Sequence, residues 1–289
     1  MRYSGAFVMA ANVTQSDGGV EVVIRAGSPP VFDVRELWRF RELFWTLASR
    51  TVLARYKQSF GGVFWAFARP IMTAVLLTIL FKRLAKLDSG DVPYALLVLA
   101  GVVPWTLFSI GLVNAANSMV SNTRLITKTY FPRIIIPTAG VVVALIEFFF
   151  GSIVLGVMLA WYGVVPTPGI VAVPLFVLLA MVTAAGMGFW LSAINVMYRD
   201  VRQVVGYITG FGMLLSPVGF RSLVVPPEWQ TLYAINPMVT VINGFRWALF
   251  GKGHLDPQQA AVSITAAVVL LVSGYLFFRR MEPRFADVI

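Results

Sequence analysis

The sequence predicts an all-α integral membrane protein with six transmembrane helices, an N-terminal amphipathic helix and two short re-entrant helices between the fifth and sixth spans. Two observations predict this class. Apolar residues make up 58% of the 289 positions and charged residues only 12%, whereas ordinary domains are about 45–50% apolar and carry enough charge to cover a soluble surface. The apolar residues also gather into runs close to the length that crosses about 30 Å of hydrocarbon.

The first 32 residues form a mixed N-terminal segment that we expect to be cytoplasmic. A short stretch within it, "VEVVIR" at 20–25, alternates apolar and polar side chains and is compatible with a β-strand. The segment has neither a compact apolar core nor a cleavage site, so we expect no signal peptide.

Residues 33–58 predict an amphipathic helix that lies in the plane of the membrane interface. Asp33 fits a helix N-cap, and Glu36 three residues later completes a capping box. Its two faces differ in polarity: Leu37, Phe40, Phe44 and Leu47 form one, and Arg35, Arg39, Glu42, Thr46 and Ser49 form the other. The alternative interpretation is a helix that packs on a soluble partner.

Six long apolar segments follow and together form a transmembrane domain over residues 59–289. They cover 63–82, 93–120, 134–162, 170–197, 204–220 and 259–278. A seventh candidate at 232–250 is long enough to span, but Asn236, Pro237, Asn243 and Arg246 interrupt it.

Charge placement decides between six spans and seven. With six spans and an internal N-terminus, cytoplasmic segments carry sixteen of the 23 Lys and Arg residues, outer loops carry six, and Arg69 is the remaining one. A seventh span would place the C-terminal "RRMEPR" outside, against the tendency of cytoplasmic loops to retain Lys and Arg. We therefore predict six spans with both termini cytoplasmic. The C-terminus forms a cytoplasmic tail at 279–289.

The segment 221–256 is then predicted to be two short helices that enter the membrane from outside and return. Non-helical backbone at membrane depth persists only where it is packed in protein or lines an aqueous cavity. This segment is therefore a candidate gate.

No enzyme site is evident in the sequence. There is no P-loop, nucleophile elbow, HExxH motif or pair of carboxylates at a useful spacing, so we do not expect the chain to hydrolyse a nucleotide or hold a cofactor. The absence of cysteine excludes disulfides and thiolate metal sites, and His254 is the sole histidine. The net charge of +10 is explained by the membrane distribution of Lys and Arg, so we do not expect nucleic acid as a partner.

Two charged residues, Arg69 and Glu147, fall within predicted spans, where each costs a few kcal/mol if it faces lipid. They are candidates for contact with a polar substrate or for a gating ion pair. The alternatives are snorkelling of Arg69 to the cytoplasmic headgroups and a buried hydrogen bond between spans for Glu147. The sequence alone leaves both pairs of interpretations open.

Aromatic and amide side chains mark a candidate channel wall. Aromatic faces can stack on sugar rings, although such rings are also common at membrane interfaces and in packed cores. Asn114, Asn117 and Ser118 share one face of the second span and would prefer a wet lumen or a partner to lipid. The aromatic candidates are Phe64, Trp65, Phe67, Trp105, Phe108, Tyr207 and Phe211.

The short cytoplasmic loops "SNTRLITKTYFPRIIIP" (121–137) and "NVMYRDVRQV" (195–204) are basic and partly helical. Such segments suit docking into another protein's surface. They are equally compatible with ordinary positive connectors.

Four stretches together resemble the permease subunits of bacterial ABC exporters for cell-surface polysaccharides, closest to the O-antigen and capsule or teichoic-acid group. They are "VLARYKQSFGGVFWAFARP" (52–70), "LITKTYFPRIIIP" (125–137), "SPVGFRSLVVPPEWQTLYAINPMVTVINGFRW" (216–247) and "FRRMEPRFADVI" (278–289). The resemblance runs from about residue 33 to the end of the chain.

This resemblance implies an inner-membrane homodimer bound to two copies of a separate ATPase subunit, which holds the ATP and Mg²⁺. The dimer would export a lipid-linked polysaccharide through a channel between the protomers. The implied ATPase-facing residues are Arg35, Arg39 and Arg41 on the interface helix, Arg124, Lys128 and Arg133 on a coupling helix, and Tyr198, Arg199, Asp200 and Arg202 on a second contact. The implied periplasmic gate holds Pro226, Trp229, Tyr233, Pro237, Asn243 and Arg246.

Two residues depart from the family pattern. Asn243 stands where many relatives carry an acid, and Arg221 follows "SPVGF" where a smaller residue is usual. The alternatives to an ABC permease are an ATP-independent flippase or secondary carrier, and a membrane glycosyltransferase of envelope biogenesis. The first predicts paired intramembrane acids and internal repeats, and the second an acidic cluster in a loop. The sequence shows one clear intramembrane acid, no repeat and short basic loops.

Overall fold

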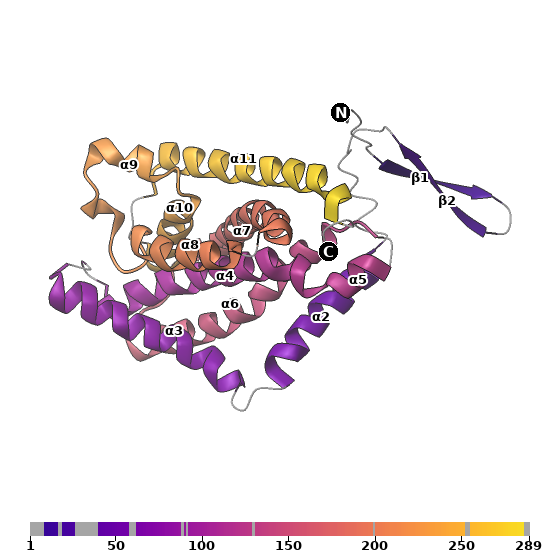
Figure 1. The fold of residues 1–289 in the computed structure, drawn as a ribbon. Coiled ribbons are helices and arrows are strands. Elements are labelled where there is room, and N and C mark those ends of the chain that lie inside the picture. The colour runs from indigo at the N-terminus through magenta and orange to yellow at the C-terminus, as the bar shows by residue number, and fades with distance from the viewer. Residues whose placement is uncertain are drawn as a thin grey trace.

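The computed structural model describes residues 9–16, 19–26, 40–57, 62–87, 90, 92–128, 131–198, 200–251 and 255–285. These residues form a bundle of helices and a separate two-stranded hairpin (Figure 1).

The hairpin pairs β1 (Met9–Ser16) with β2 (Gly19–Ala26) in antiparallel register, with Met9 opposite Ala26. The strand predicted at 20–25 from its alternating pattern is therefore confirmed. The hairpin lies outside the helical bundle (Figure 1), so the all-α description holds for the bundle and not for the N-terminal segment.

Helix α2 (Arg41–Lys57) packs against α6, and its buried face carries Leu47 and Ala48. The opposite face is not uniformly polar, because Trp45 is 64% exposed and Leu53 is 58% exposed on it. The predicted N-cap Asp33 lies outside the described residues, as do Arg35 and Arg39.

Five helical segments of the described chain are long and apolar enough to cross a membrane. Apolar residues and good helix formers fill each of them, and α3 continues through Pro70 into a π-helical turn. The five are α3 (Gly62–Thr78) with its extension Ile79–Leu84, α4 (Tyr94–Ser121), α6 (Ile135–Trp161), α7 (Val173–Met197) with the preceding turn Pro168–Ala172, and α11 (Pro257–Met281).

The segment predicted as the fifth span is shorter in the structure. Helix α8 (Val201–Leu215) has 15 residues, which at 1.5 Å per residue reach about 22 Å, less than the ~30 Å of hydrocarbon. The predicted end at residue 220 was wrong because Pro217 has no N–H and excludes the α conformation from the residue before it. Ser216 is accordingly extended, with φ −92° and ψ 155°.

Helix α4 is the centre of the bundle and packs on α3, α6, α7, α8 and α10. Its buried residues include Leu96, Leu99 and Leu112, each with no exposed surface. Behind it, α7 and α11 approach so closely that a Cβ at Gly274 would clash with the Gly186 carbonyl oxygen. Glycine at this crossing is therefore required for the contact between the two helices.

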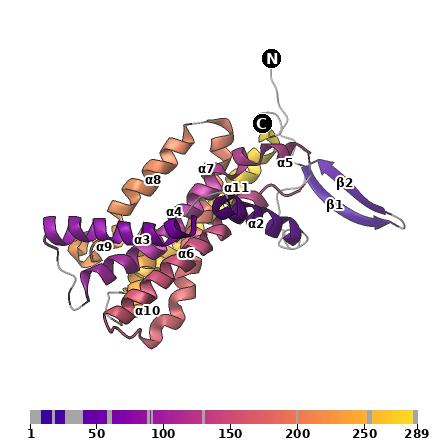
Figure 2. The same ribbon diagram turned by 90° about the horizontal axis from the view of Figure 1, so that it is seen from below.

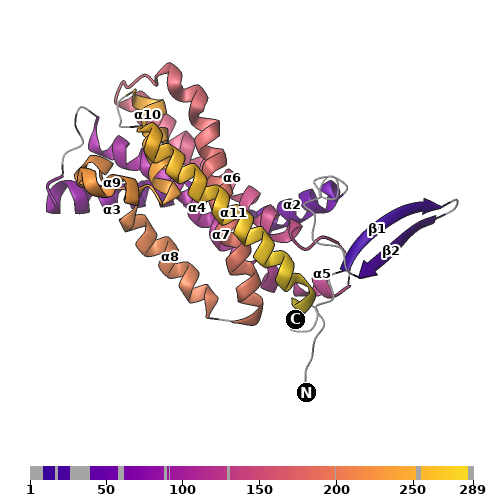
Figure 3. The same cartoon turned by 90° about the horizontal axis from the view of Figure 1, so that it is seen from above.

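The bundle has two ends with different contents (Figures 1 and 3). One end gathers α2, the short helix α5 (Thr123–Lys128) and the ends of α4, α6, α7 and α11 around one apolar cluster. The other end holds α9 (Pro227–Tyr233) and α10 (Pro237–Phe250). Helix α8 runs between the ends: Val201 packs beside Ala116 near the first, and the Leu215 carbonyl accepts a hydrogen bond from Tyr233 at the second.

Candidate transport cavity

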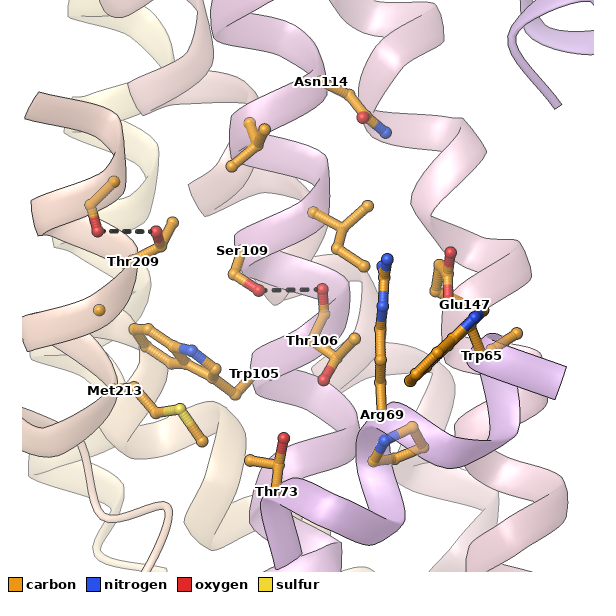
Figure 4. Close-up of a pocket in the computed structure, with 16 residues that line it drawn as sticks. Trp65, Arg69, Thr73, Trp105, Thr106, Ser109, Asn114, Glu147, Thr209 and Met213 are labelled. Atoms are coloured by element: carbon orange, nitrogen blue, oxygen red, sulfur yellow. Dashed lines mark hydrogen bonds between the residues drawn. The ribbon is translucent and has the colours of Figure 1, made fainter. Parts of the chain in front are cut away.

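A cavity of about 630 Å³ opens between α3, α4, α6 and α8 (Figure 4). Figure 2 shows α8 set away from the rest of the bundle along much of its length. The cavity is lined by Trp65, Ala66, Arg69, Pro70, Thr73, Trp105, Thr106, Ser109, Ile110, Val113, Asn114, Glu147, Gly206, Thr209, Gly210 and Met213.

Hydroxyl and amide groups make part of this wall polar. The Ser109 hydroxyl donates to the Thr106 carbonyl at 3.2 Å, and the Thr209 hydroxyl donates to the Val205 carbonyl at 3.0 Å. A hydroxyl that donates its proton to the backbone retains lone pairs that accept from another molecule. The Asn114 amide is fixed by a 3.1 Å bond to the Gly140 carbonyl. The wall therefore offers positioned acceptors among apolar and indole surfaces.

The structure brings the two charged residues of the predicted spans, Arg69 and Glu147, to the same cavity. In Figure 4 the Arg69 side chain lies beside Trp65, and Glu147 of α6 lies close to both. Glu147 is only 5% exposed, whereas Arg69 is exposed on the cavity side of α3. One wall of the cavity thus carries a cation and an acid within the apolar length of the bundle.

The structure separates the predicted channel residues into two groups. Trp65, Arg69, Trp105 and Asn114 line the cavity, and the others do not. Phe67 packs edge-on against Phe150 with ring centroids 5.0 Å apart, Phe108 is 3% exposed beneath Trp105, and Asn117 accepts from Asn195. Phe64, Tyr207 and Phe211 are exposed outside the lining, with the last two stacked at 6.0 Å.

Several lining residues were missed from the sequence, namely Thr73, Thr106, Ser109, Thr209 and Met213. A signal for part of this set was present, because positions 106, 109, 110, 113 and 114 recur every three or four residues and share one face of α4. No such signal indicated which face of α8 would turn inward.

At the α9–α10 end, Arg246 holds the segment that follows α8. Its guanidinium donates to the carbonyls of Leu97 at 3.1 Å, Phe220 at 2.8 Å and Val218 at 2.7 Å, and the residue is 5% exposed. The planar guanidinium presents its donors in a fixed fork, which suits three carbonyls from two segments. Arg246 therefore ties α10 to α4 and to the turn 216–220.

Three further side chains hold the same turn. The Tyr94 hydroxyl donates to the Gly219 carbonyl at 2.7 Å, the Tyr233 hydroxyl to the Leu215 carbonyl at 2.8 Å, and the Asn236 amide to the Ser216 hydroxyl at 2.9 Å. Burial raises the pKa of the Tyr233 phenol above its ordinary value. We call Tyr94, Tyr233, Asn236 and Arg246 the outer clamp.

The other predicted gate residues lie around this clamp. Trp229 is 59% exposed, Pro226 is exposed and Pro237 is buried at the start of α10. Asn243 accepts a hydrogen bond from the Ser222 hydroxyl at 2.7 Å. At position 243 the chain thus places an amide that bonds a neutral hydroxyl.

At the opposite end, most of the predicted ATPase-facing side chains that the structure describes are exposed. Arg41, Arg124, Tyr198, Asp200 and Arg202 are on the surface. Arg133 instead turns toward its own chain, and its guanidinium donates to the Glu282 carbonyl at 2.6 Å. Arg199 and the Lys128 side chain lie outside the described residues.

A bundle of membrane-length helices with a part-polar cavity in its wall is the kind of architecture found in membrane transport components. The sequence profile of the ABC-2 type transporter family matches residues 42–250, and the chain belongs to this family.

Its relatives align over nearly their whole length. The chain is 29% identical to the O-antigen export system permease protein RfbA of Myxococcus xanthus, over 89% of this chain and 98% of that protein. It is 25% identical to an RfbA of Klebsiella pneumoniae, over 86% and 95%. It is 22% identical to the capsule polysaccharide export inner-membrane protein CtrC of Neisseria meningitidis serogroup A, over 82% and 92%.

Proposed function

We propose that this ABC-2 permease exports a lipid-linked cell-surface polysaccharide across the inner membrane, as a homodimer bound to two copies of a separate ATPase subunit. The relatives named for O-antigen and capsule export support the polysaccharide as cargo, because the chain aligns with them over 92–98% of their lengths. ATP hydrolysis on the partner supplies the free energy, and this chain supplies contacts that differ between its two states.

The composition of the cavity wall is the observation that carries the proposal. A glycan on a lipid is an amphiphile with hydroxyl-rich rings, an anionic linkage and an apolar tail. Trp65, which is 48% exposed, offers a face for a sugar ring, the Thr and Ser hydroxyls offer acceptors, and Arg69 offers a cation for the linkage. The apolar surfaces of α3 and α8 on either side suit the tail.

We further propose six crossings, with α8 and the turn that follows it forming the fifth. Helix α8 connects the two ends of the bundle: Val201 packs beside Ala116 at one end, and the Leu215 carbonyl accepts a hydrogen bond from Tyr233 at the other. Six crossings place both termini and the basic loops on the cytoplasmic side. They place α9 and α10 outside, as the re-entrant gate that the outer clamp holds shut.

The ATPase would bind the cytoplasmic end through α2, α5 and the connection between α7 and α8. Exposed basic side chains at this end, Arg41, Arg124 and Arg202, support this surface. The experiment is to co-express the chain with the ABC ATPase encoded beside it, purify through a tag on one subunit, and measure glycan-stimulated ATP hydrolysis. Failure of the ATPase to co-purify, or an intact complex after deletion of residues 33–57, contradicts the arrangement.

Replacing Arg69 with Gln is expected to lower export about tenfold or more while the protein folds normally. The reason is that a hydrogen bond to a charged group is worth about 1.5–3 kcal/mol, and Gln, which is shorter but still polar, removes the charge. Export of glycan to the cell surface in a permease-deletion strain is the measurement. Arg69→Lys should recover part of the activity.

Arg83→Gln is the matched control, since Arg83 is an exposed cation on the extension of α3 beyond the cavity. Equal export by Arg69→Gln and wild type would show that Arg69 only snorkels to the headgroups.

A further inference from the structure

The C-terminal turn Glu282–Arg284 clasps the connection between α5 and α6. The Arg133 backbone N–H donates to Glu282 Oε1 at 3.1 Å, and the Arg133 guanidinium donates to the Glu282 carbonyl at 2.6 Å. Arg279 on α11 donates to Glu282 Oε2 at 2.9 Å. Both carboxylate oxygens are therefore used, one toward the α5–α6 connection and one toward α11.

Beneath this clasp lies the apolar cluster of the same end. Phe285 follows the turn with no exposed surface, and its ring lies edge-on to Phe278 of α11 with centroids 5.3 Å apart. Ile126 of α5 and Leu47 of α2 are buried in the same cluster. The end of α11 and α5 thus contact the same apolar cluster, in addition to the link through Glu282.

The other end of α11 is bonded to α9 and α10. The Ser263 hydroxyl donates to the Ala234 carbonyl at 2.7 Å, and the Thr240 hydroxyl of α10 donates to Ser263 at 2.7 Å. The Gln259 amide donates to Gln230 Oε1 on α9 at 3.2 Å. All three contacts are buried or half-buried.

Between its ends, α11 is held against α7 and cannot bend freely. The Trp190 ring stacks on Phe277 with centroids 4.1 Å apart, and its indole N–H donates to Ser273. The close crossing at Gly186 and Gly274 adds backbone contact. Helix α11 is accordingly one continuous, supported element that reaches from the α5 end to the α9–α10 end (Figure 3).

We propose that Glu282 is a positioning residue that fixes the α5–α6 connection to α11, and that α11 carries movement of α5 to the gate helices α9 and α10. This inference rests on the proposed function, because there the ATPase is what moves α5. Its physical basis is a supported helix that is packed and hydrogen-bonded at both ends, which is one kind of connection that can couple two distant sites.

The test uses the full permease–ATPase complex in lipid vesicles, with three separate readouts: co-purification of the ATPase, ATP hydrolysis, and ATP-dependent export. Glu282→Ala removes the carboxylate but leaves the Arg133 guanidinium bonded to the backbone carbonyl. We expect Glu282→Ala to retain the ATPase and its hydrolysis while export falls at least about fivefold, the lower range of allosteric coupling. Arg284→Ala is the matched control, since Arg284 is exposed in the same turn.

A fourth readout follows the gate directly. The chain has no cysteine, so Leu232→Cys on α9, where the side chain is 55% exposed, accepts a single nitroxide label. The label should change its mobility when the wild-type complex binds ATP and should not change in Glu282→Ala. A purely structural role for Glu282 would alter yield or stability without abolishing this response.

Ser263→Ala tests the same route from the other end and covers the case in which Glu282→Ala fails to fold. Ser263→Ala should reproduce the uncoupling. The double variant, Glu282→Ala with Ser263→Ala, should export no less than the single variant that exports less, because the effects of two substitutions on one route are not additive. Full export and a full spectral response in either single variant would overturn the inference, as would loss of ATPase binding in Glu282→Ala. Absence of ATP-dependent export in the wild-type complex would instead contradict the proposed function.

Discussion

Replacing Arg246 with Met is expected to destabilise the protein by about 3 kcal/mol or more, because three backbone carbonyls lose a buried hydrogen-bond donor. Met approximates the length of the side chain but donates no hydrogen bond. The carbonyls of Leu97, Val218 and Phe220 then lose their donor, and each unpaired buried polar group costs about 1–3 kcal/mol. The measurement is the midpoint of thermal unfolding of detergent-purified protein, followed by tryptophan fluorescence.

Two further variants sharpen this result. Arg246→Lys should fall between Met and the wild type, because an ammonium group on a flexible stem cannot reproduce the planar fork. Arg83→Met removes an exposed cation of the same kind and should leave the midpoint unchanged. An Arg246→Met protein that unfolds at the wild-type temperature would show that the carbonyls find other partners and that the outer clamp contributes little.

The helices of the bundle were largely predictable because local runs of apolar residues determine where they lie in the sequence. Runs of apolar residues locate α4, α6, α7 and α11 within a few residues, since each helix must satisfy its own backbone in hydrocarbon. The end of α8 was misplaced, although Pro217 marked it, because hydropathy continues to residue 220 while the helix does not. An apolar composition reports burial or lipid contact, and it does not report helix continuity.

The cavity was predictable only in part, because it depends on how helices turn toward one another. Arg69, Trp65 and Asn114 were found because charged, indole and amide groups are conspicuous in apolar spans. Tyr207 and Phe211 were expected in the channel on the same ground, yet the rotation of α8 places Gly206 and Thr209 in the lining instead. Side-chain type identifies candidates, whereas tertiary packing selects among them.

Contacts between distant segments were the least predictable features. Arg246 was expected in the gate, but its three carbonyl partners come from residues 97, 218 and 220, which no periodicity relates to it. Glu282 was not predicted as a functional residue, because a carboxylate between arginines near a C-terminus is typical of a solvated tail. Such contacts require the structure because their sequence separation reaches 149 residues.

Reversing the charge of Arg124 and Lys128 to Glu is expected to lower export about tenfold or more without unfolding the spans. Helix α5 is anchored by Ile126, which is 5% exposed in the apolar cluster, and Arg124 is exposed on the helix surface. The anchor is therefore untouched by the substitutions. Losing one partner of a close charge pair at an interface costs about 2–5 kcal/mol, and reversal adds repulsion. Export in a permease-deletion strain and yield of folded protein are the measurements.

Arg280 is an exposed cation at the α5 end of α11. Arg280→Glu therefore gives a matched change in charge per site outside α5 and should leave export near the wild-type level. Normal export by the Arg124 and Lys128 variant would remove α5 from the coupling surface. The stronger test is rescue: if α5 meets acidic residues of the ATPase, substituting Lys for those acids should restore export to the reversed variant and impair it with the wild-type chain. Only direct contact predicts both changes, because a general effect of charge on membrane insertion would not be repaired by a substitution in the other subunit.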